Sequence, residues 1–147
     1  MKKLILGLAA ALFVSAGFAQ ATGTATPVAE IVKFKETVHD FGKIKQSVPV
    51  NFDFAFKNIS SKPLVIETAL ASCGCTTPKW PQQPVGKNKN DKINAGFNAA
   101  ASGPFEKTIT VKISGAAQPI ELKIKGEVLT ADAFAKYEAE KGKKSGK

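Results

Sequence analysis

The sequence contains no arginine, and this absence limits the partners that it predicts. All 21 basic side chains are lysines, against 12 acidic ones, and the formal net charge is +9. Arginine is the side chain that recognises phosphates and base edges through paired hydrogen bonds. We therefore expect no nucleic-acid partner and interpret the lysines as charges that keep the surface soluble. Binding to anionic surface polymers is an alternative that rests on charge alone.

Residues that build metal sites and cross-links are also scarce. The chain has two cysteines, Cys73 and Cys75, and a single histidine, His39. Structural zinc normally takes four ligands of these types, so a complete zinc site within one chain is not expected. The two cysteines are only two positions apart, which excludes the disulfide that commonly joins the two sheets of a β-sandwich. The core must hold by packing, for which ten phenylalanines are available.

Recognisable catalytic motifs are missing as well. The sequence shows no nucleophile–base pair, no paired carboxylates, no glycine-rich phosphate loop and no metalloprotease motif. An enzyme is therefore not predicted, and no cofactor is expected apart from the copper considered below.

What the sequence does contain begins with an export signal. Met1-Lys2-Lys3 is followed by the apolar run "LILGLAAALFV" at residues 4–14 and then by small residues. This order is typical of a secretory signal peptide over residues 1–21, and the run is too short for an ordinary membrane span. We expect cleavage after Ala19 or Ala21, with no lipid anchor, because no cysteine follows the run. The mature protein is predicted to be periplasmic or extracellular, where disulfides persist.

Most of the remaining chain follows the two-residue period of β-strands. In the clearest segment, residues 48–56, apolar side chains alternate with polar or small ones and form an aromatic face for the core. That face consists of Val48, Val50, Phe52, Phe54 and Phe56. Weaker patterns recur between turn residues. They predict further strands at residues 31–38, 64–72, 93–97, 108–114 and 120–128.

These patterns predict an all-β fold, a single immunoglobulin-like antiparallel β-sandwich of about seven strands over residues 30–129. Residues 22–29 are small and polar and are expected to form a linker. After the last strand we expect a short helix over residues 130–141, with Thr130 as its N-cap. Residues 142–147 are expected to form a disordered basic tail.

Four motifs occur in order and at suitable spacing. They are "HDFGKI" at 39–44, "FKNISSKPLVI" at 56–66, "SCGCTTPKWPQQPV" at 72–85 and "GPFEKTITVKI" at 103–113. In these motifs the chain resembles the bacterial domain-of-unknown-function family 1573 over about residues 38–128. The resemblance implies export and an immunoglobulin-like sandwich related to domains of the major sperm protein and cilium-associated type. The motif residues, to which the resemblance assigns no role, are His39, Asp40, Phe41, Gly42, Gly74 and Trp80.

Three states are open to Cys73 and Cys75. They can form a disulfide, which needs a turn that Gly74 permits and which closes too small a loop to contribute more than about 1.5 kcal/mol. They can bind a soft ion such as Cu(I) through two thiolates. They can also be local structure, with Trp80 packed near the turn. We favour local structure, as free thiols or as a local disulfide.

His39 stands beside Asp40 and could serve as a ligand or a base. We interpret it instead as the cap of a strand end, with Asp40, Phe41 and Gly42 forming the turn.

Together these features predict an exported, non-catalytic binding or scaffold module of the bacterial envelope. Its partner would be an envelope protein or polymer, and a sandwich has edge strands that can accept a partner strand. This step is an analogy at the level of the fold. The alternative is a periplasmic thiol-redox or copper-binding protein that acts through Cys73 and Cys75.

Overall fold

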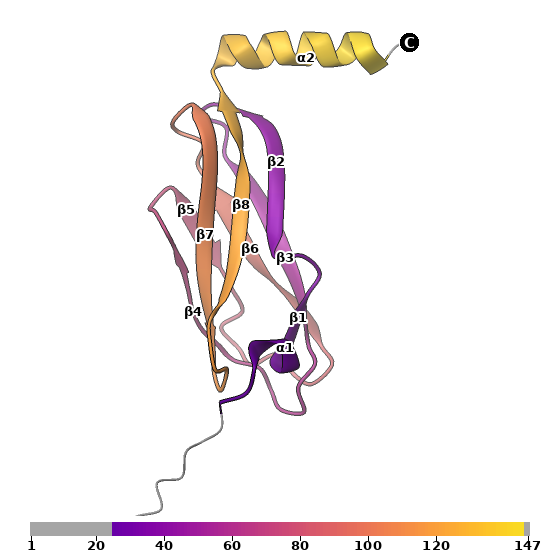
Figure 1. Ribbon diagram of the computed structural model, residues 1–147, viewed down its shortest axis with the longest axis vertical. Helices are drawn as coiled ribbons and strands as arrows, with labels where there is room; N and C mark the ends of the chain where they lie inside the picture. Colours follow the sequence, from indigo (N-terminus) through magenta and orange to yellow (C-terminus); the bar gives the residue numbers. More distant parts are fainter. Residues whose placement is uncertain (1–24, 146–147) are drawn as a thin grey trace, which may run out of the picture.

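The alternating segments form eight strands in two four-stranded sheets, as the computed structural model shows for residues 25–145 (Figure 1). The first sheet has the order β1 (Val32–Phe34), β3 (Val50–Asn58), β6 (Asn90–Phe97), β5 (Thr76–Lys79). The second has the order β2 (Val38–Lys45), β8 (Ile120–Leu129), β7 (Gly103–Ile113), β4 (Ile66–Ala71). The predicted immunoglobulin-like fold class is confirmed. The predicted signal peptide lies outside the described residues.

The core lies between the two sheets and is lined by the residues that the alternation selected. Phe54 is fully buried and Phe56 nearly so, and the inward positions of β6, β7 and β8 complete the interior. These positions are Ile93, Ala95, Phe97, Ile109, Val111, Ile113, Leu122, Ile124 and Val128. Val48 was wrongly assigned to this face, since it is 47% exposed. It precedes β3 in a turn, where its N–H donates to the Lys45 carbonyl.

The strand predicted at residues 31–38 is two strands. β1 pairs with β3 in the first sheet, and after a short link β2 pairs with β8 in the second. Because this link moves the chain from one sheet to the other, β2 runs parallel to β8, whereas the other strand pairings are antiparallel. The sandwich therefore departs from the fully antiparallel arrangement that we predicted.

The described part of the predicted linker is structured. Thr26 forms a bridge with Ala116 through two backbone hydrogen bonds, and the short helix α1 (Val28–Ile31) follows. Ile31 at the end of α1 is buried in the core. The chain is therefore attached to the sandwich from Thr26 onwards.

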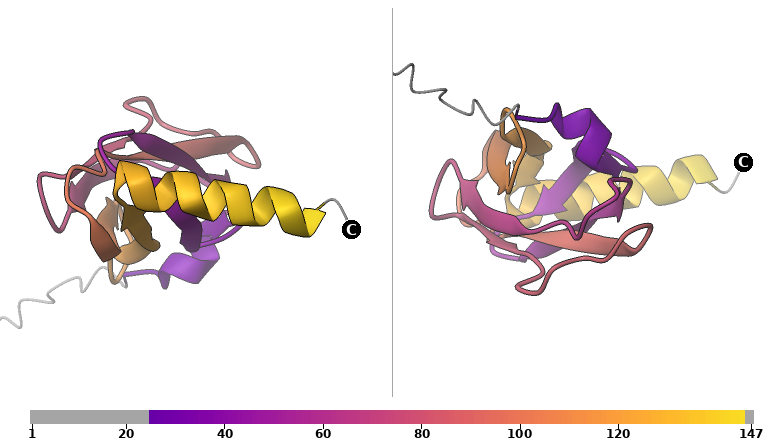
Figure 2. Two further views of the ribbon diagram at one scale, coloured as in Figure 1. Left: turned by 90° about the horizontal axis from the view of Figure 1, so that it is seen from above. Right: turned by 90° about the horizontal axis from the view of Figure 1, so that it is seen from below.

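The predicted C-terminal helix is present but longer than expected. α2 (Ala131–Ser145) is capped by Thr130, whose hydroxyl accepts the Ala133 N–H. The disordered tail predicted from residue 142 is wrong up to Ser145, because lysine favours helices and its charge suits their C-terminal ends. α2 crosses one end of the sandwich and projects beyond it (Figure 2). No helix within residues 25–145 is long and apolar enough to cross a membrane.

Candidate functional site

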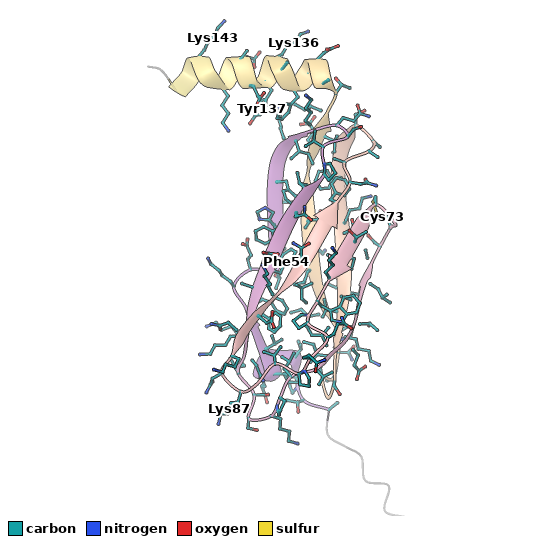
Figure 3. All side chains as sticks on the ribbon, turned by 180° about the vertical axis from the view of Figure 1, so that it is seen from behind. Phe54, Cys73, Lys87, Lys136, Tyr137 and Lys143 are labelled. Atoms are coloured by element: carbon teal, nitrogen blue, oxygen red, sulfur yellow. A yellow bond between two sulfur atoms is a disulfide. The ribbon has the colours of Figure 1, made fainter. Side chains whose placement is uncertain are left out.

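The cysteine segment forms the turn that carries the chain from β4 to β5, and so from one sheet to the other. Cys73 and Cys75 are joined by a disulfide, with their Cα atoms 5.3 Å apart. The Thr76 N–H donates to the Cys73 carbonyl and closes the turn. Cys73 lies at the margin of the sandwich, whereas Phe54 lies in its middle (Figure 3). Of the three states considered for the cysteines, the structure shows the local disulfide.

Gly74 does not have the role that we predicted for it. Its φ lies outside the left-handed region that favours glycine, and a Cβ built at this position would meet no atom within 4 Å. The turn therefore does not need glycine for its backbone conformation. What Gly74 does provide is an exposed position without a side chain next to the disulfide.

Thr76, the first residue of β5, places its hydroxyl beside both sulfur atoms. Thr76 Oγ1 lies 3.8 Å from Cys73 Sγ and 4.0 Å from Cys75 Sγ. The residue is only 3% exposed. A buried hydroxyl normally has a strong hydrogen-bond partner, and disulfide sulfurs are weak acceptors. We did not predict this contact, because Thr76 is one of two adjacent threonines and the sequence does not distinguish them.

A small hollow with both polar and apolar lining lies next to the disulfide on the outer surface of the first sheet. Its volume is about 160 Å³, and Gly74 and Cys75 form part of its rim. Gly96 forms its floor, where a Cβ would approach Thr77 Oγ1 to 2.9 Å and Asn51 Oδ1 to 3.0 Å. A Cβ at this position would therefore displace the side chain of Thr77 or Asn51, and these two side chains give the hollow neutral hydrogen-bond donors and acceptors.

The edge of β4 next to this turn has backbone groups that do not pair with β7. The Ser72 N–H donates to the Thr108 carbonyl, which makes these two residues a hydrogen-bonded pair. Hydrogen-bonded and non-bonded pairs alternate along an antiparallel ladder. With the register of β4 and β7, the backbone groups of Ala69 and Ala71 consequently point away from the sheet.

The other three edges are each protected. In β5, the Asn98 N–H donates to the Cys75 carbonyl, and the same alternation turns Pro78, which has no N–H, outwards. β1 is three residues long and contains Lys33, while β2 has a bulge between Asp40 and Lys43. Short length, proline, lysine and bulges are the devices that prevent edge pairing. β4 contains neither lysine nor proline, and its single irregularity lies between Ile66 and Thr68, before Ala69, which is buried, and Ala71, which is half-buried.

The "HDFG" residues do not form a turn, and they lie far from the cysteines. They belong to β2, which is the opposite edge of the sheet from β4. His39 stacks on Phe52 with ring centroids 3.5 Å apart and meets Phe41 edge-on. Asp40 accepts the Gly42 N–H, and Gly42 has a φ of 65°, so that these residues form the β-bulge. The prediction failed because a bulge and a turn use the same residue types.

Trp80 and the predicted copper site are the remaining candidates. Trp80 follows β5 and packs against the buried core. After Trp80 the chain continues to Val85, which forms an isolated bridge with Leu64. Between residues 25 and 145 no group of three or more His, Cys, Asp or Glu side chains is placed to hold a metal ion. Soft ions bind thiolates, and a disulfide has none, so copper binding at Cys73 and Cys75 would require prior reduction.

Several solved structures share this fold at low sequence identity. A crystal structure of a protein of unknown function from Porphyromonas gingivalis W83 matches with a TM-score of 0.59 and 14% identity, over 75% of this chain and 50% of that chain. The ASH/PapD-like domain 7 of human CEP192 matches with a TM-score of 0.54 and 9% identity, over 83% and 99%. The secreted serine protease VesC of Vibrio cholerae matches with a TM-score of 0.55 and 6% identity, over 68% and 23%.

These likenesses show the fold alone, and the chain spans about half the length of the P. gingivalis protein. A search of curated proteins gave no match. The sequence profile of the family described as protein of unknown function (DUF1573) matches residues 32–128, which include both sheets and the cysteine turn. The chain therefore belongs to the DUF1573 family, as its four motifs predicted.

Proposed function

We propose that this chain is a non-catalytic binding module of the bacterial envelope, which takes an extended segment of a partner protein beside β4. The observation that carries the proposal is the difference between the sheet edges. β1, β2 and β5 are blunted, whereas β4 has neither lysine nor proline and turns the backbone groups of the half-buried Ala71 away from β7, beside the exposed Leu70. Outward N–H and C=O groups at a strand edge select a polypeptide, because a partner strand satisfies them through a hydrogen-bonded ladder.

The surroundings of β4 favour an uncharged and apolar segment. Leu70 points outwards between the two alanines and is 65% exposed. A partner strand would place an apolar side chain beside it, since neighbouring residues on one face of a sheet pack together. Glu67 is engaged by Lys112, with Oε2 and Nζ 2.9 Å apart, and this hydrogen bond lowers the pKa of the Glu67 carboxyl. Charge at this edge is therefore already paired.

The proposal is tested with two variants that blunt the edge and one matched control. Leu70→Lys and Ala71→Pro should lower the affinity for a captured envelope protein by about tenfold or more, because each copies a natural edge-blocking device. Val38→Lys places the same charge on the opposite edge of the same sheet and should bind like the wild type.

Amide hydrogen exchange of the complex locates the contact. Slower exchange of residues 67–71, together with loss of capture by Leu70→Lys but not by Val38→Lys, would support the proposal. Capture that Leu70→Lys leaves unchanged would contradict it. A wild-type dimer that this variant converts to monomers would show that the occupant is a second copy, and the partner-protein proposal would then be wrong.

Export is the second part of the proposal, and it rests on the signal-peptide pattern of residues 1–21. N-terminal sequencing of the protein from the envelope fraction should give Gln20 or Thr22 as the first residue. A chain that begins at Met1 in that fraction would contradict export through cleavage.

A further inference from the structure

The disulfide turn combines three features that strand binding at β4 does not use: a disulfide between two half-buried cysteines, a buried hydroxyl beside both sulfurs and a small hollow at one cysteine. We infer that the Cys73–Cys75 disulfide is a thiol–disulfide exchange site for a dithiol of a partner. In this exchange the incoming thiolate attacks Cys75, and Cys73 leaves with a hydrogen bond from Thr76.

The turn is held in place by contacts that do not depend on the S–S bond. The Ser72 N–H is bonded to β7, and the Cys75 carbonyl is bonded to the Asn98 N–H at the end of β6. A backbone hydrogen bond between Thr76 and Cys73 closes the turn itself. A disulfide between residues two positions apart also restricts the unfolded chain very little. Reduction should therefore leave the fold and the geometry of the site intact.

The position of the Thr76 hydroxyl suits the leaving group of the reaction. In the oxidised state its neighbours at 3.8 and 4.0 Å are weak sulfur acceptors. When the S–S bond breaks, one sulfur becomes a thiolate, and hydrogen bonds to ionised acceptors are shorter and stronger. Because Thr76 Oγ1 lies within 4.0 Å of both sulfurs, it can donate to Cys73 Sγ when the partner attacks Cys75 from the hollow.

The hollow determines the side from which a partner approaches. Gly74 and Cys75 line it, and Cys73 does not. Gly74 has no side chain and open space around it, so the turn is open on this side of the half-buried Cys75. The neutral groups of Asn51 and Thr77 at the hollow can form hydrogen bonds with the backbone beside the attacking thiol.

The exchange proceeds in two balanced steps. A partner thiolate attacks Cys75 Sγ, a mixed disulfide forms, and the S–S bond breaks to leave Cys73 as a thiolate. The second thiolate of the same dithiol then attacks the partner's sulfur of the mixed disulfide and releases Cys75. The dithiol is oxidised by two electrons to a disulfide, and Cys73 and Cys75 are reduced and take up two protons from water.

The first test measures the rate at which dithiothreitol, a simple dithiol, reduces the purified mature protein. Thr76→Val removes the hydroxyl at constant shape and should slow reduction about tenfold, the effect of losing one hydrogen bond to a charged group. Thr76→Ser keeps the hydroxyl and should react like the wild type. Thr110→Val, at an exposed threonine of β7 that does not line the hollow, is the matched control and should also be unchanged. An equal rate for Thr76→Val and the wild type would overturn the role of Thr76.

The second test identifies the attacked sulfur without relying on Thr76. The wild-type protein is treated with glutathione, quenched with acid during the reaction and mapped by peptide mass spectrometry. The adduct should be on Cys75, and circular dichroism of the fully reduced protein should match that of the oxidised form. An adduct on Cys73, or a disulfide that dithiothreitol reduces only after unfolding, would overturn the inference.

Discussion

The interior around Phe54 and the turn at Cys73 are stabilised in different ways. Phe54 is fully buried between two sheets and belongs to a continuous apolar cluster. The turn is half-exposed at the margin and contains the disulfide, a few hydrogen bonds and a hollow lined by polar and apolar groups. The region with the covalent bond is thus the one that excludes less water.

This difference shows that the covalent bond is not what keeps the domain folded. Removal of apolar surface from water stabilises a fold in proportion to the area that is buried, whereas a disulfide stabilises it in proportion to the loop that it closes. The interior buries the larger apolar area and the disulfide closes only a very small loop, so the interior contributes more to the stability of the fold. Thiol chemistry at the turn can therefore occur without unfolding the sandwich.

The largest effect expected is in the interior. Phe54→Ala should lower the free energy of unfolding by about 3–5 kcal/mol, because it leaves a cavity at the centre of the aromatic face. Domains of this size are stable by only about 5–15 kcal/mol, so the variant should unfold at a much lower urea concentration. Val48→Ala, at an exposed position of the same alternating pattern, is the control. An unchanged urea midpoint for Phe54→Ala would show that the interior around Phe54 is not the main source of stability.

Substitution of Asn58, a polar residue in the interior, should also destabilise the fold strongly. Asn58 is fully buried, and its Nδ2 donates to the carbonyls of Lys62 and Val85 while its Oδ1 accepts the Ser60 N–H. Asn58→Ala should cost about 2–4 kcal/mol, because it leaves several buried groups without partners. The control is Asn90→Ala at an exposed position, which chemical denaturation should not distinguish from the wild type. Equal loss in both variants would contradict the role of Asn58.

At the turn, the double substitution Cys73→Ser/Cys75→Ser should cost only about 1–2 kcal/mol, most of which is the small loop closed by the disulfide. The variant should remain folded and bind the partner proposed for β4 like the wild type. Thermal denaturation of the variant and of the reduced wild type should give similar midpoints. Unfolding of either protein at ordinary temperature would show that the disulfide is a structural staple.

Deletion of residues 130–147 tests whether the C-terminal helix α2 contributes to the stability of the sandwich. α2 contacts the sandwich at β2 and β8, and Lys43 Nζ lies 5.0 Å from the centre of the Tyr137 ring. An exposed cation–π contact is worth about 0.5–1 kcal/mol, so the truncated protein should stay folded with a slightly lower melting temperature. A loss comparable to that of Phe54→Ala would make α2 part of the core.

The smallest effect should come from Gly74. Gly74→Ala should leave stability unchanged within about 0.5 kcal/mol, because the backbone conformation and the surrounding space both accommodate a Cβ. Gly96→Ala is the informative contrast, since its Cβ would clash with Thr77 and Asn51. Destabilisation of Gly74→Ala, measured by urea denaturation, would show that the turn needs glycine after all.

The sequence predicted the features that depend on local alternation. The period-two pattern placed Phe54 and Phe56 in the core, and the four motifs identified the family. β5 was missed because "TTPK" has no apolar alternation, and it becomes a strand only by pairing with β6. The bulge at Gly42 and the outward backbone of Ala69 depend on the register of distant strands, which a local pattern does not contain.

The parallel pairing of β2 and β8 has a mechanical consequence. Val38 pairs with Lys123 at one end of this ladder, and Lys45 pairs with Leu129 at the other. The segment that enters β2 and the segment that leaves β8 towards α2 are therefore at opposite ends of the same ladder. Tension between these two segments would shear the strands along their length and load the hydrogen bonds together, instead of opening them one by one. Such a domain would yield slowly under a pulling force, at a rate set by its barrier to unfolding rather than by its equilibrium stability.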